Sequence, residues 1–170
     1  HVIVEERIPI HPALRKFAVK GTPDIRIIVF NSVPIMSFLR LPTEESEGRA
    51  NLHQGAIAAG VDIATGITTH AITGKGERIY HLPNTKRKLN GIKLPFWNRI
   101  LTTAIRTAQA SGLYFSAIDL FVDENKGPMV VEINANPGLS IQLANRAGLR
   151  KRLERVAGLN VLDVAHGAKI

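Results

Sequence analysis

The chain has 170 residues, of which 45% are hydrophobic, and it carries a formal charge of +8 at pH 7 with a pI near 10.2. That length and apolar content suffice for one packed domain, and the positive charge favours anionic partners such as nucleotides, acidic substrates or nucleic acid. The absence of cysteine excludes disulfides, thiolate metal sites and a thiol nucleophile. The sequence also has no apolar run of membrane-spanning length and no signal peptide pattern, so we expect a soluble, cytoplasmic protein with no membrane partner.

The first third of the chain predicts a β-hairpin. Residues 2–8 form a β-rich stretch, and a connection punctuated by proline and glycine follows. Residues 24–30 and 33–39 are rich in β-branched and aromatic residues and are separated only by Asn31-Ser32. Two apolar runs with a two-residue polar break between them are typical of a hairpin.

The middle of the chain predicts a second hairpin and a long loop. Residues 56–63 and 67–73 flank an Ala-Thr-Gly turn. Residues 73–93 are rich in glycine, lysine, proline and asparagine, so we expect mostly loop with one short strand at 77–81. The sequence Gly74-Lys75-Gly76 resembles a phosphate-binding loop, but its place between two hairpin strands favours a tight turn.

The last part of the chain predicts helices around a third hairpin. A helix should begin near Pro95 and end before Gly112, because apolar residues recur at helical spacing between them. Residues 114–122 and 128–134 are expected as paired strands, and residues 148–156 as a basic helix. Three hairpins with few βαβ units predict an α+β fold with an antiparallel sheet and packed helices, in one domain over residues 1–170.

Acidic residues on the third hairpin are the main candidates for chemistry. Side chains alternate along a strand, so Glu132 and Asn134 share one face. If Val122 lies opposite Met129, Asp119 lies opposite Glu132, with about 5 Å between cross-strand partners. Unpaired like charges at that distance repel and invite a divalent cation. Two carboxylates and an amide oxygen are the ligand types that suit Mg²⁺ or Mn²⁺.

A second interpretation is that both carboxylates are solvated on an exposed sheet face. The neighbours of Glu132 weigh against it, because a strand containing Val130, Val131 and Ile133 should bury its apolar side chains. An Asn-Pro-Gly sequence shortly after Asn134 also fixes the chain there. Spacing alone leaves both interpretations open.

The segments AIDLF and GPMVVEINANPGL resemble the metal-binding hairpin in the C-terminal lobe of ATP-grasp ligases. Further resemblances follow in the order of that family. VEERI (residues 4–8) is similar to its interlobe hinge strand, DIRIIVFNSVPIMSFLR to its Asp-x-Arg hairpin, and GRANLHQGA to its nucleotide loop, as in α-L-glutamate ligases. The segments NLHQGAIAAGVDIATG, THAITGKGERIY and PGLSIQLANRAGLRKRL resemble the sugar-transfer-associated branch, so the likeness covers nearly the whole chain.

The resemblance implies roles for residues at both ends of the chain. Asp119, Glu132 and Asn134 would be magnesium ligands. The main chain at Glu6 and Arg7 would face the adenine of ATP.

Further roles fall on the first hairpin and the loop after it. Asp24 would lie near the ribose, and Arg49 and Asn51 would line the nucleotide loop. Arg26 would act on phosphate or acyl-phosphate oxygens, which the donor fork of a guanidinium matches. His53 is either a structural hydrogen-bonding residue or a substrate contact.

The resemblance also implies the reaction. A carboxylate substrate would attack ATP to give an acyl phosphate, and an amine would then displace phosphate, with Mg²⁺ or Mn²⁺ as the metal. The family's N-terminal substrate domain and its glycine-rich lobe do not precede Val2. We therefore expect a fragment that supplies one wall of the site and is inactive in isolation. No motif specifies the acid, the amine or the oligomeric state.

Two other functions stay open. The basic segments 85–93 and 145–156 could mark a nucleic-acid-binding module, but few aromatic residues lie near them for base stacking, so we expect no nucleic-acid partner. The chain could also be an ATP-grasp remnant without catalysis, although the acidic pair and Asn134 are all retained.

Overall fold

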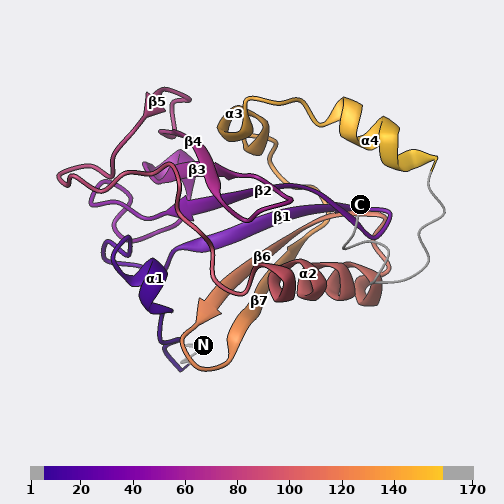
Figure 1. The fold of residues 1–170 in the computed structure, drawn as a ribbon, viewed down its shortest axis with the longest axis horizontal. Coiled ribbons are helices and arrows are strands. Elements are labelled where there is room, and N and C mark those ends of the chain that lie inside the picture. The colour runs from indigo at the N-terminus through magenta and orange to yellow at the C-terminus, as the bar shows by residue number, and fades with distance from the viewer. Residues whose placement is uncertain (1–5, 159–170) are drawn as a thin grey trace, which may run out of the picture.

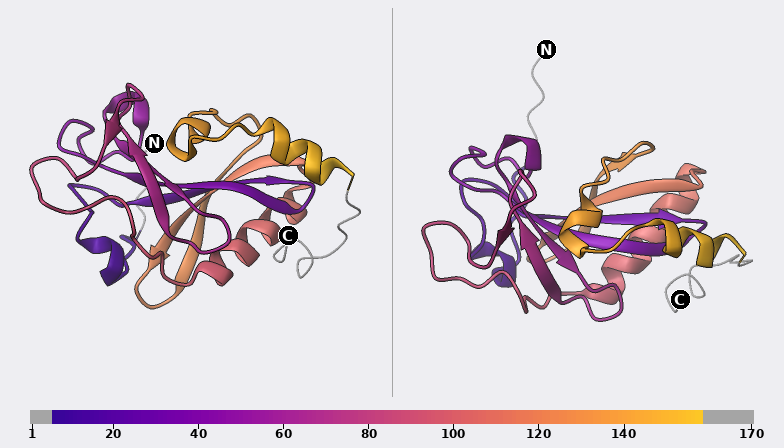
Figure 2. Two further views of the ribbon diagram at one scale, coloured as in Figure 1. Left: turned by 45° about the horizontal axis from the view of Figure 1, so that its top comes forward. Right: turned by 90° about the horizontal axis from the view of Figure 1, so that it is seen from above.

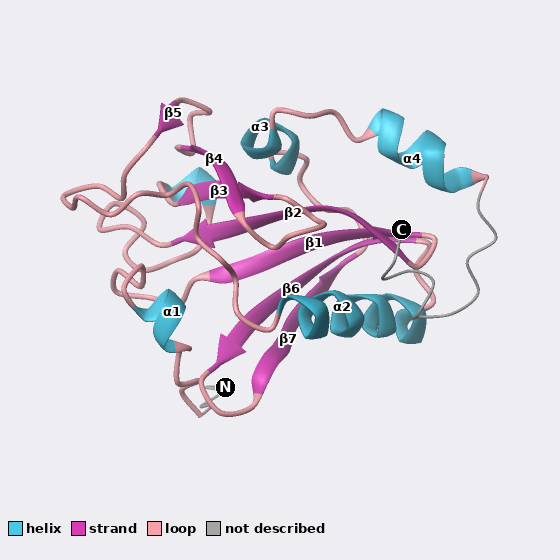
Figure 3. Ribbon diagram, in the orientation of Figure 1, coloured by secondary structure: helices cyan, strands magenta, loops and turns pink. Residues whose placement is uncertain are grey.

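The computed structural model of the protein describes residues 6–158, and a seven-stranded antiparallel sheet lies at its centre (Figures 1 and 3). In spatial order the strands are β5 (Arg78–Ile79), β4 (Thr68–Ile72), β3 (Ile57–Val61), β2 (Val33–Leu41), β1 (Asp24–Phe30), β6 (Phe115–Asp123) and β7 (Gly127–Asn134). Every neighbouring pair is antiparallel. The predicted α+β class is confirmed.

Helices lie on both faces of this sheet (Figure 2). They are α1 (Pro12–Arg15), the 3₁₀ turn η1 (Leu52–Gln54), α2 (Trp97–Ser111), α3 (Ile141–Asn145) and α4 (Arg150–Ala157). Helix α2 contacts β1, β2, β6 and β7, whereas α3 contacts β2, β3 and β4 and α4 contacts β2. Within residues 6–158 no helix has both the length and the apolar character needed to cross a bilayer.

Strand alternation divides the apolar side chains between two cores. On β1, Ile25 and Ile27 pack with α2 residues such as Ile100 in one core. Ile28 points to the other face and packs with Ile141 of α3. Each of these side chains is fully buried, and each burial contributes about 1.5–3 kcal/mol.

Most predicted elements are confirmed. Strand β2 continues two residues beyond its predicted end, and the turn Asn31-Ser32 has φ values of 47° and 61°, the left-handed geometry that two-residue hairpin turns favour. Helix α2 ends at Ser111, and Gly112, with a φ of 69°, forms its left-handed C-cap. The predicted strand at 2–8 lies largely outside the described residues, and residues 6–8 are not a strand. Helices α1 and α3 were not anticipated.

Three strand pairs shift register at a β-bulge or irregularity, namely β1–β2, β3–β4 and β6–β7. The first and the last are each caused by one extra residue. In the β1–β2 pair, Val29 faces Pro34 but Ile28 faces Met36, so Ile35 is the extra residue. In the β6–β7 pair, Leu120 faces Val130 but Asp119 faces Glu132. A bulge adds one residue to one strand, so every pair beyond it moves by one position.

The bulge in β7 confirms one pairing and corrects another. Asp119 does lie opposite Glu132, as predicted. The assumed pairing of Val122 with Met129 is wrong, because Val122 faces Pro128. Between the turn and the extra residue Val131, the pairs are offset by one position from the predicted register. Beyond Val131, from the Asp119–Glu132 pair onward, they match it.

Strand β7 also corrects the expectation that its apolar side chains are buried. Val130, Val131 and Ile133 are 40%, 50% and 41% exposed. In the described part of the chain β7 is an edge strand with β6 as its one neighbour. Most apolar residues of β6, which lies between β1 and β7, are buried, whereas these three residues of β7 are not.

Candidate functional site

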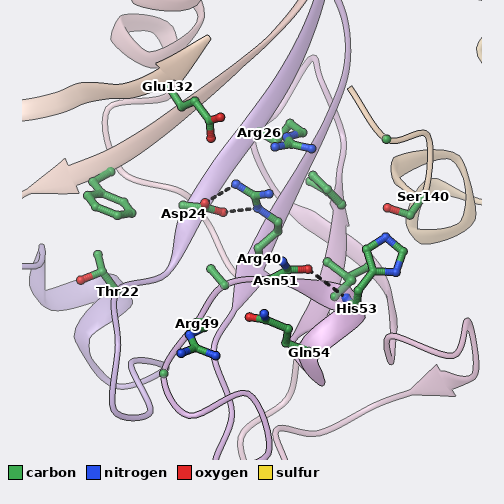
Figure 4. A pocket seen from close by; sticks show the side chains of 16 residues that line it. Thr22, Asp24, Arg26, Arg40, Arg49, Asn51, His53, Gln54, Glu132 and Ser140 are labelled. Atoms are coloured by element: carbon green, nitrogen blue, oxygen red, sulfur yellow. Dashed lines mark hydrogen bonds and ion pairs between the residues drawn. The ribbon is translucent and has the colours of Figure 1, made fainter. Parts of the chain in front are cut away.

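A cavity of about 640 Å³ opens on the sheet face that also carries α3 (Figure 4). It is lined by Thr22, Asp24, Arg26, Phe38, Arg40, Gly48, Arg49, Ala50, Asn51, Leu52, His53, Gln54, Phe121, Glu132, Gly138 and Ser140. Strands β1, β2, β6 and β7 supply the charged floor, and the loop before η1 supplies one side. Glu132 points from β7 toward Asp24 and Arg40 across this floor.

Two buried carboxylates and two partly buried arginines form one network at the floor. Arg26 donates from Nε and Nη2 to the two carboxylate oxygens of Asp119, each at 2.7 Å. Arg40 donates from Nε to Asp24 Oδ1 at 2.6 Å, and its Nη2 donates to Asp24 Oδ2 and, at 2.8 Å, to Asp119 Oδ2. Their side chains are 3–13% exposed. Both arginines therefore present fixed, largely desolvated guanidinium groups.

Burial perturbs the protonation of this network. Removal from water raises the pKa of Asp24 to about 6, even though the hydrogen bonds and charge of Arg40 act to lower it. Burial alone would lower the pKa of Arg40, but the hydrogen bond and charge of Asp24, together with Asp119, raise it above its ordinary value. Arg40 is thus a permanent cation.

Neither guanidinium is fully used. A guanidinium has five N–H donors. In the described part of the chain, Arg26 and Arg40 donate only through Nε and Nη2, and the Nη1 group of each makes no hydrogen bond. Each arginine therefore keeps donors for a further oxyanion.

Five of the predicted site residues line this cavity: Asp24, Arg26, Arg49, Asn51 and Glu132. Arg49 is exposed on the loop before η1, and Asn51 caps that turn by accepting a hydrogen bond from the His53 amide at 3.0 Å. The sequence therefore identified residues from three separate elements that the fold brings together.

The predicted metal ligands occupy different environments. Asp119 is 2% exposed beneath the two arginines, whereas Glu132 is exposed. The expectation that their charges are unpaired is wrong for Asp119, since Arg26 and Arg40 neutralise it. In residues 6–158 no three carboxylate or imidazole side chains converge on one point.

The donor set nevertheless fits a magnesium ion. Asn134 lies two residues beyond Glu132 on the same strand face, and its amide nitrogen is buried without a hydrogen-bond partner among the described residues. A half-turn of that amide would present its oxygen instead. Asp119, Glu132 and Asn134 then offer only oxygen donors, which Mg²⁺ prefers. A bound ion would share Asp119 with the arginines.

The two residues that were predicted to face the adenine lie at a smaller cavity of about 310 Å³. Glu6 and Arg7 line it together with the apolar side chains of Ile8, Pro9, Phe121, Met129, Val130 and Val131. Phe121 lines this cavity and the charged one, so the two adjoin at that residue.

Sequence reasoning missed Arg40 and Phe38. An unbulged β1–β2 hairpin closed by Asn31-Ser32 would place Leu39 opposite Asp24. The bulge at Ile35 places Arg40 there instead. The usable signal was local, because Phe38 and Arg40 stand two residues apart on β2 and share a face.

Close backbone contacts hold the loop that carries Arg49. A Cβ built on Gly21 would lie 1.7 Å from the carbonyl oxygen of Gly48, so only glycine permits this approach.

The Gly74-Lys75-Gly76 segment is a tight turn between β4 and β5, as predicted. It is closed by hydrogen bonds from Thr73 N to Glu77 O and from Gly76 N to Thr73 O, each at 2.9 Å.

Comparisons with known proteins agree on one family. A family model described as sugar-transfer associated ATP-grasp matches residues 1–158. A probable α-L-glutamate ligase of Picosynechococcus sp. is 30% identical over 120 residues, which are 71% of this chain and 28% of that protein. A probable α-L-glutamate ligase of Pseudomonas putida is 30% identical over 119 residues, 70% of this chain and 28% of that protein. The chain thus spans about 28% of the length of these curated relatives.

A solved structure is also similar. It is the ATP-grasp ligase PsnB complexed with a phosphomimetic variant of a minimal precursor, Mg and ADP. The similarity covers 76% of this chain and 29% of that chain, at 16% identity and a TM-score of 0.39.

Proposed function

This chain belongs to the sugar-transfer-associated ATP-grasp family, and from that premise we propose that it forms one wall of the active site of an ATP- and magnesium-dependent carboxylate–amine ligase. The second wall would come from another lobe of a longer protein. The α-L-glutamate ligase-like relatives motivate the reaction class.

The observation that carries the proposal is the arginine-lined cavity. Arg26, Arg40 and Arg49 line one space with the exposed carboxylate of Glu132. Guanidinium groups bind phosphate oxygens through paired hydrogen bonds, and the buried carboxylates hold two of these groups in place before a ligand arrives. Such preorganisation favours an anionic transition state, because the donors need no rearrangement.

The adjoining cavities match the two ends of a nucleotide. The smaller cavity has apolar side chains from Ile8, Phe121 and Met129, which suit the faces of a purine. Main-chain groups at Glu6 and Arg7 would read the edge of the base. The triphosphate would extend past Phe121 into the charged cavity, where Asp24 would lie near the ribose.

A magnesium ion would be held by Asp119, Glu132 and Asn134, and when bound it would neutralise charge on the ATP phosphates. The chain's own residues position the reactants. Arg26 and Arg40 would direct their remaining donors at the transferred phosphoryl group and at the acyl phosphate. Arg49 and Asn51 would close over the phosphates from the loop before η1. Catalysis would thus depend on positioning and electrostatics, without a protein nucleophile.

The test is a pair of carboxylate substitutions. Glu132→Gln removes an exposed proposed ligand, and Glu154→Gln removes an exposed carboxylate on α4 that pairs with Arg150. Isothermal titration with ADP should show that magnesium raises the ADP affinity of the wild-type chain and of Glu154→Gln. The factor by which magnesium raises that affinity should be at least about tenfold smaller for Glu132→Gln.

The same substitutions separate a ligase from a non-catalytic remnant. In the complete protein that carries this chain, Glu132→Gln should lower ATP-dependent phosphate release by orders of magnitude while circular dichroism stays unchanged. Equal magnesium dependence in both variants, or undiminished phosphate release in Glu132→Gln, would remove the metal assignment and with it the proposed mechanism.

A further inference from the structure

A second cavity of about 750 Å³ adjoins the arginine-lined one, with Leu52 and His53 of η1 in the walls of both. Resting on the proposed function, we infer that this second cavity binds the amine substrate of the ligase in its protonated form. Its other walls come from the loop after β2, the turn between β4 and β5, and residues 82–85. Nothing in the nucleotide assignment uses this space.

The charge of the second cavity is opposite to that of the first. Glu44, Glu45 and Glu77 line it, against Lys75 as its one ammonium group. Glu44 is paired with Lys20, but in residues 6–158 neither Glu45 nor Glu77 forms an ion pair. An acidic hollow on a chain of charge +8 selects for cations, because carboxylates at its rim repel phosphate and carboxylate ligands.

The walls of this cavity are built rather than loose. The Glu45 side chain lies against Gly55, where an added Cβ would approach Glu45 Cγ to 2.7 Å. Gly55 itself has a φ of 96° and its carbonyl accepts a hydrogen bond from Thr43 Oγ1 at 2.9 Å. On the other side, a Cβ on Gly74 would lie 1.9 Å from the carbonyl oxygen of Leu52. The segment that carries Glu45 and the turn that carries Glu77 are therefore both packed closely against η1 and its cap Gly55.

Neutral groups in the cavity suit an organic amine better than a bare metal ion. Leu82, Pro83 and Ile57 provide apolar surface. The buried hydroxyl of Thr73 has no hydrogen-bond partner among the described residues, and Asn84 adds a polar side chain. A cationic amine with an apolar or hydroxylated body would contact each kind of group.

The reaction explains why two cavities of opposite charge should meet. A carboxylate and the phosphates of ATP belong beside the arginines, whereas an ammonium group would be repelled there. The two substrates must nevertheless react with each other. The shared wall at Leu52 and His53 is where the acceptor, after its ammonium group loses a proton to solvent, would reach an acyl phosphate in the basic cavity. The neutral nitrogen would attack the acyl carbon, form the amide bond and displace inorganic phosphate. His53 is thus placed to contact the acceptor.

The experiment is an NMR titration of the ¹⁵N-labelled chain with 1,4-diaminobutane at constant ionic strength. Its uncharged analogue 1,4-butanediol is the control ligand. The test variant is Glu45→Gln/Glu77→Gln. The control variant is Glu124→Gln, a carboxylate at the β6–β7 turn that pairs with Arg15. The same samples are titrated separately with magnesium ADP.

We expect saturable shifts at residues 44–45, 74–77 and 84–85 with the diamine but not with the diol. The double variant should weaken diamine binding roughly fivefold, and Glu124→Gln should leave it unchanged. Magnesium ADP should shift the loop at 48–51 equally in all three proteins.

The outcomes separate the two claims. Diamine shifts that are matched by the diol, or that survive in the double variant, would overturn the acceptor site while ADP binding leaves the proposed function standing. Specific diamine binding without any ADP response would overturn the proposed function, and the role of acceptor would fall with it.

Discussion

Replacing Arg40 by methionine should show how the charged floor is held together. Arg40 is the one ion partner of Asp24 in the described part of the chain, whereas Asp119 is paired with both Arg26 and Arg40. The carboxylate side chains of Asp24 and Asp119 are 9% and 3% exposed. Methionine keeps an apolar stem of similar length, so the change removes mainly the charge and the donors.

The magnitude follows from what each substitution leaves behind. Removing one partner of a buried ion pair costs about 3–5 kcal/mol, because the other charge stays buried without compensation. Arg40→Met leaves Asp24 in that condition, so we expect a loss near 3 kcal/mol at pH 7.5. Arg26→Met should cost about 1–2 kcal/mol, since Asp119 keeps the hydrogen bond from Arg40. A domain with about 5–15 kcal/mol of stability would stay folded in both cases.

Urea unfolding, followed by the fluorescence of Trp97, measures these losses. The double variant Asp24→Asn/Arg40→Met should be more stable than Arg40→Met alone, because it removes the uncompensated carboxylate. At pH 5 the penalty of Arg40→Met should shrink as Asp24 takes up a proton. The reasoning is refuted if Arg40→Met destabilises the protein less than Arg26→Met does. It is also refuted if the double variant Asp24→Asn/Arg40→Met is less stable than Arg40→Met.

Three further outcomes test other parts of the structure. Because the pKa of Asp24 rises to about 6 on folding, wild-type stability should fall relative to Asp24→Asn as pH rises from 4 to 7, by about 2 kcal/mol in urea titrations; a constant difference would contradict the shift. In calorimetric titrations, Phe121→Ala should weaken ADP binding at least about tenfold and leave pyrophosphate binding unchanged. Equal losses for both ligands would argue against adenine binding in the smaller cavity. Gly21→Ala should lower the urea midpoint through its clash with Gly48, whereas Gly138→Ala, with no atom near its Cβ, should not; similar midpoints would refute the close contact.

Local pattern determined most of the secondary structure. Apolar runs with a two-residue polar turn specified β1 and β2, and helical spacing with a terminal glycine specified α2, because these signals act between near neighbours along the chain. The ordered motifs also identified Asp24, Arg26 and Glu132, which the fold brings to one cavity.

Tertiary structure decided which charges meet. A single extra residue in β2 places Arg40 rather than Leu39 opposite Asp24, and one in β7 places Glu132 opposite Asp119. Such bulges depend on how the whole sheet twists and packs, so strand periodicity does not reveal them.

Burial likewise came only from the assembled sheet. Asp119 on the covered strand β6 is enclosed and neutralised by two arginines, although the sequence suggested a bare carboxylate. Val131 and Ile133 on the edge strand β7 are exposed, although their apolar character suggested a core. The sequence states which side chains alternate along a strand, and the position of that strand in the sheet decides what covers them.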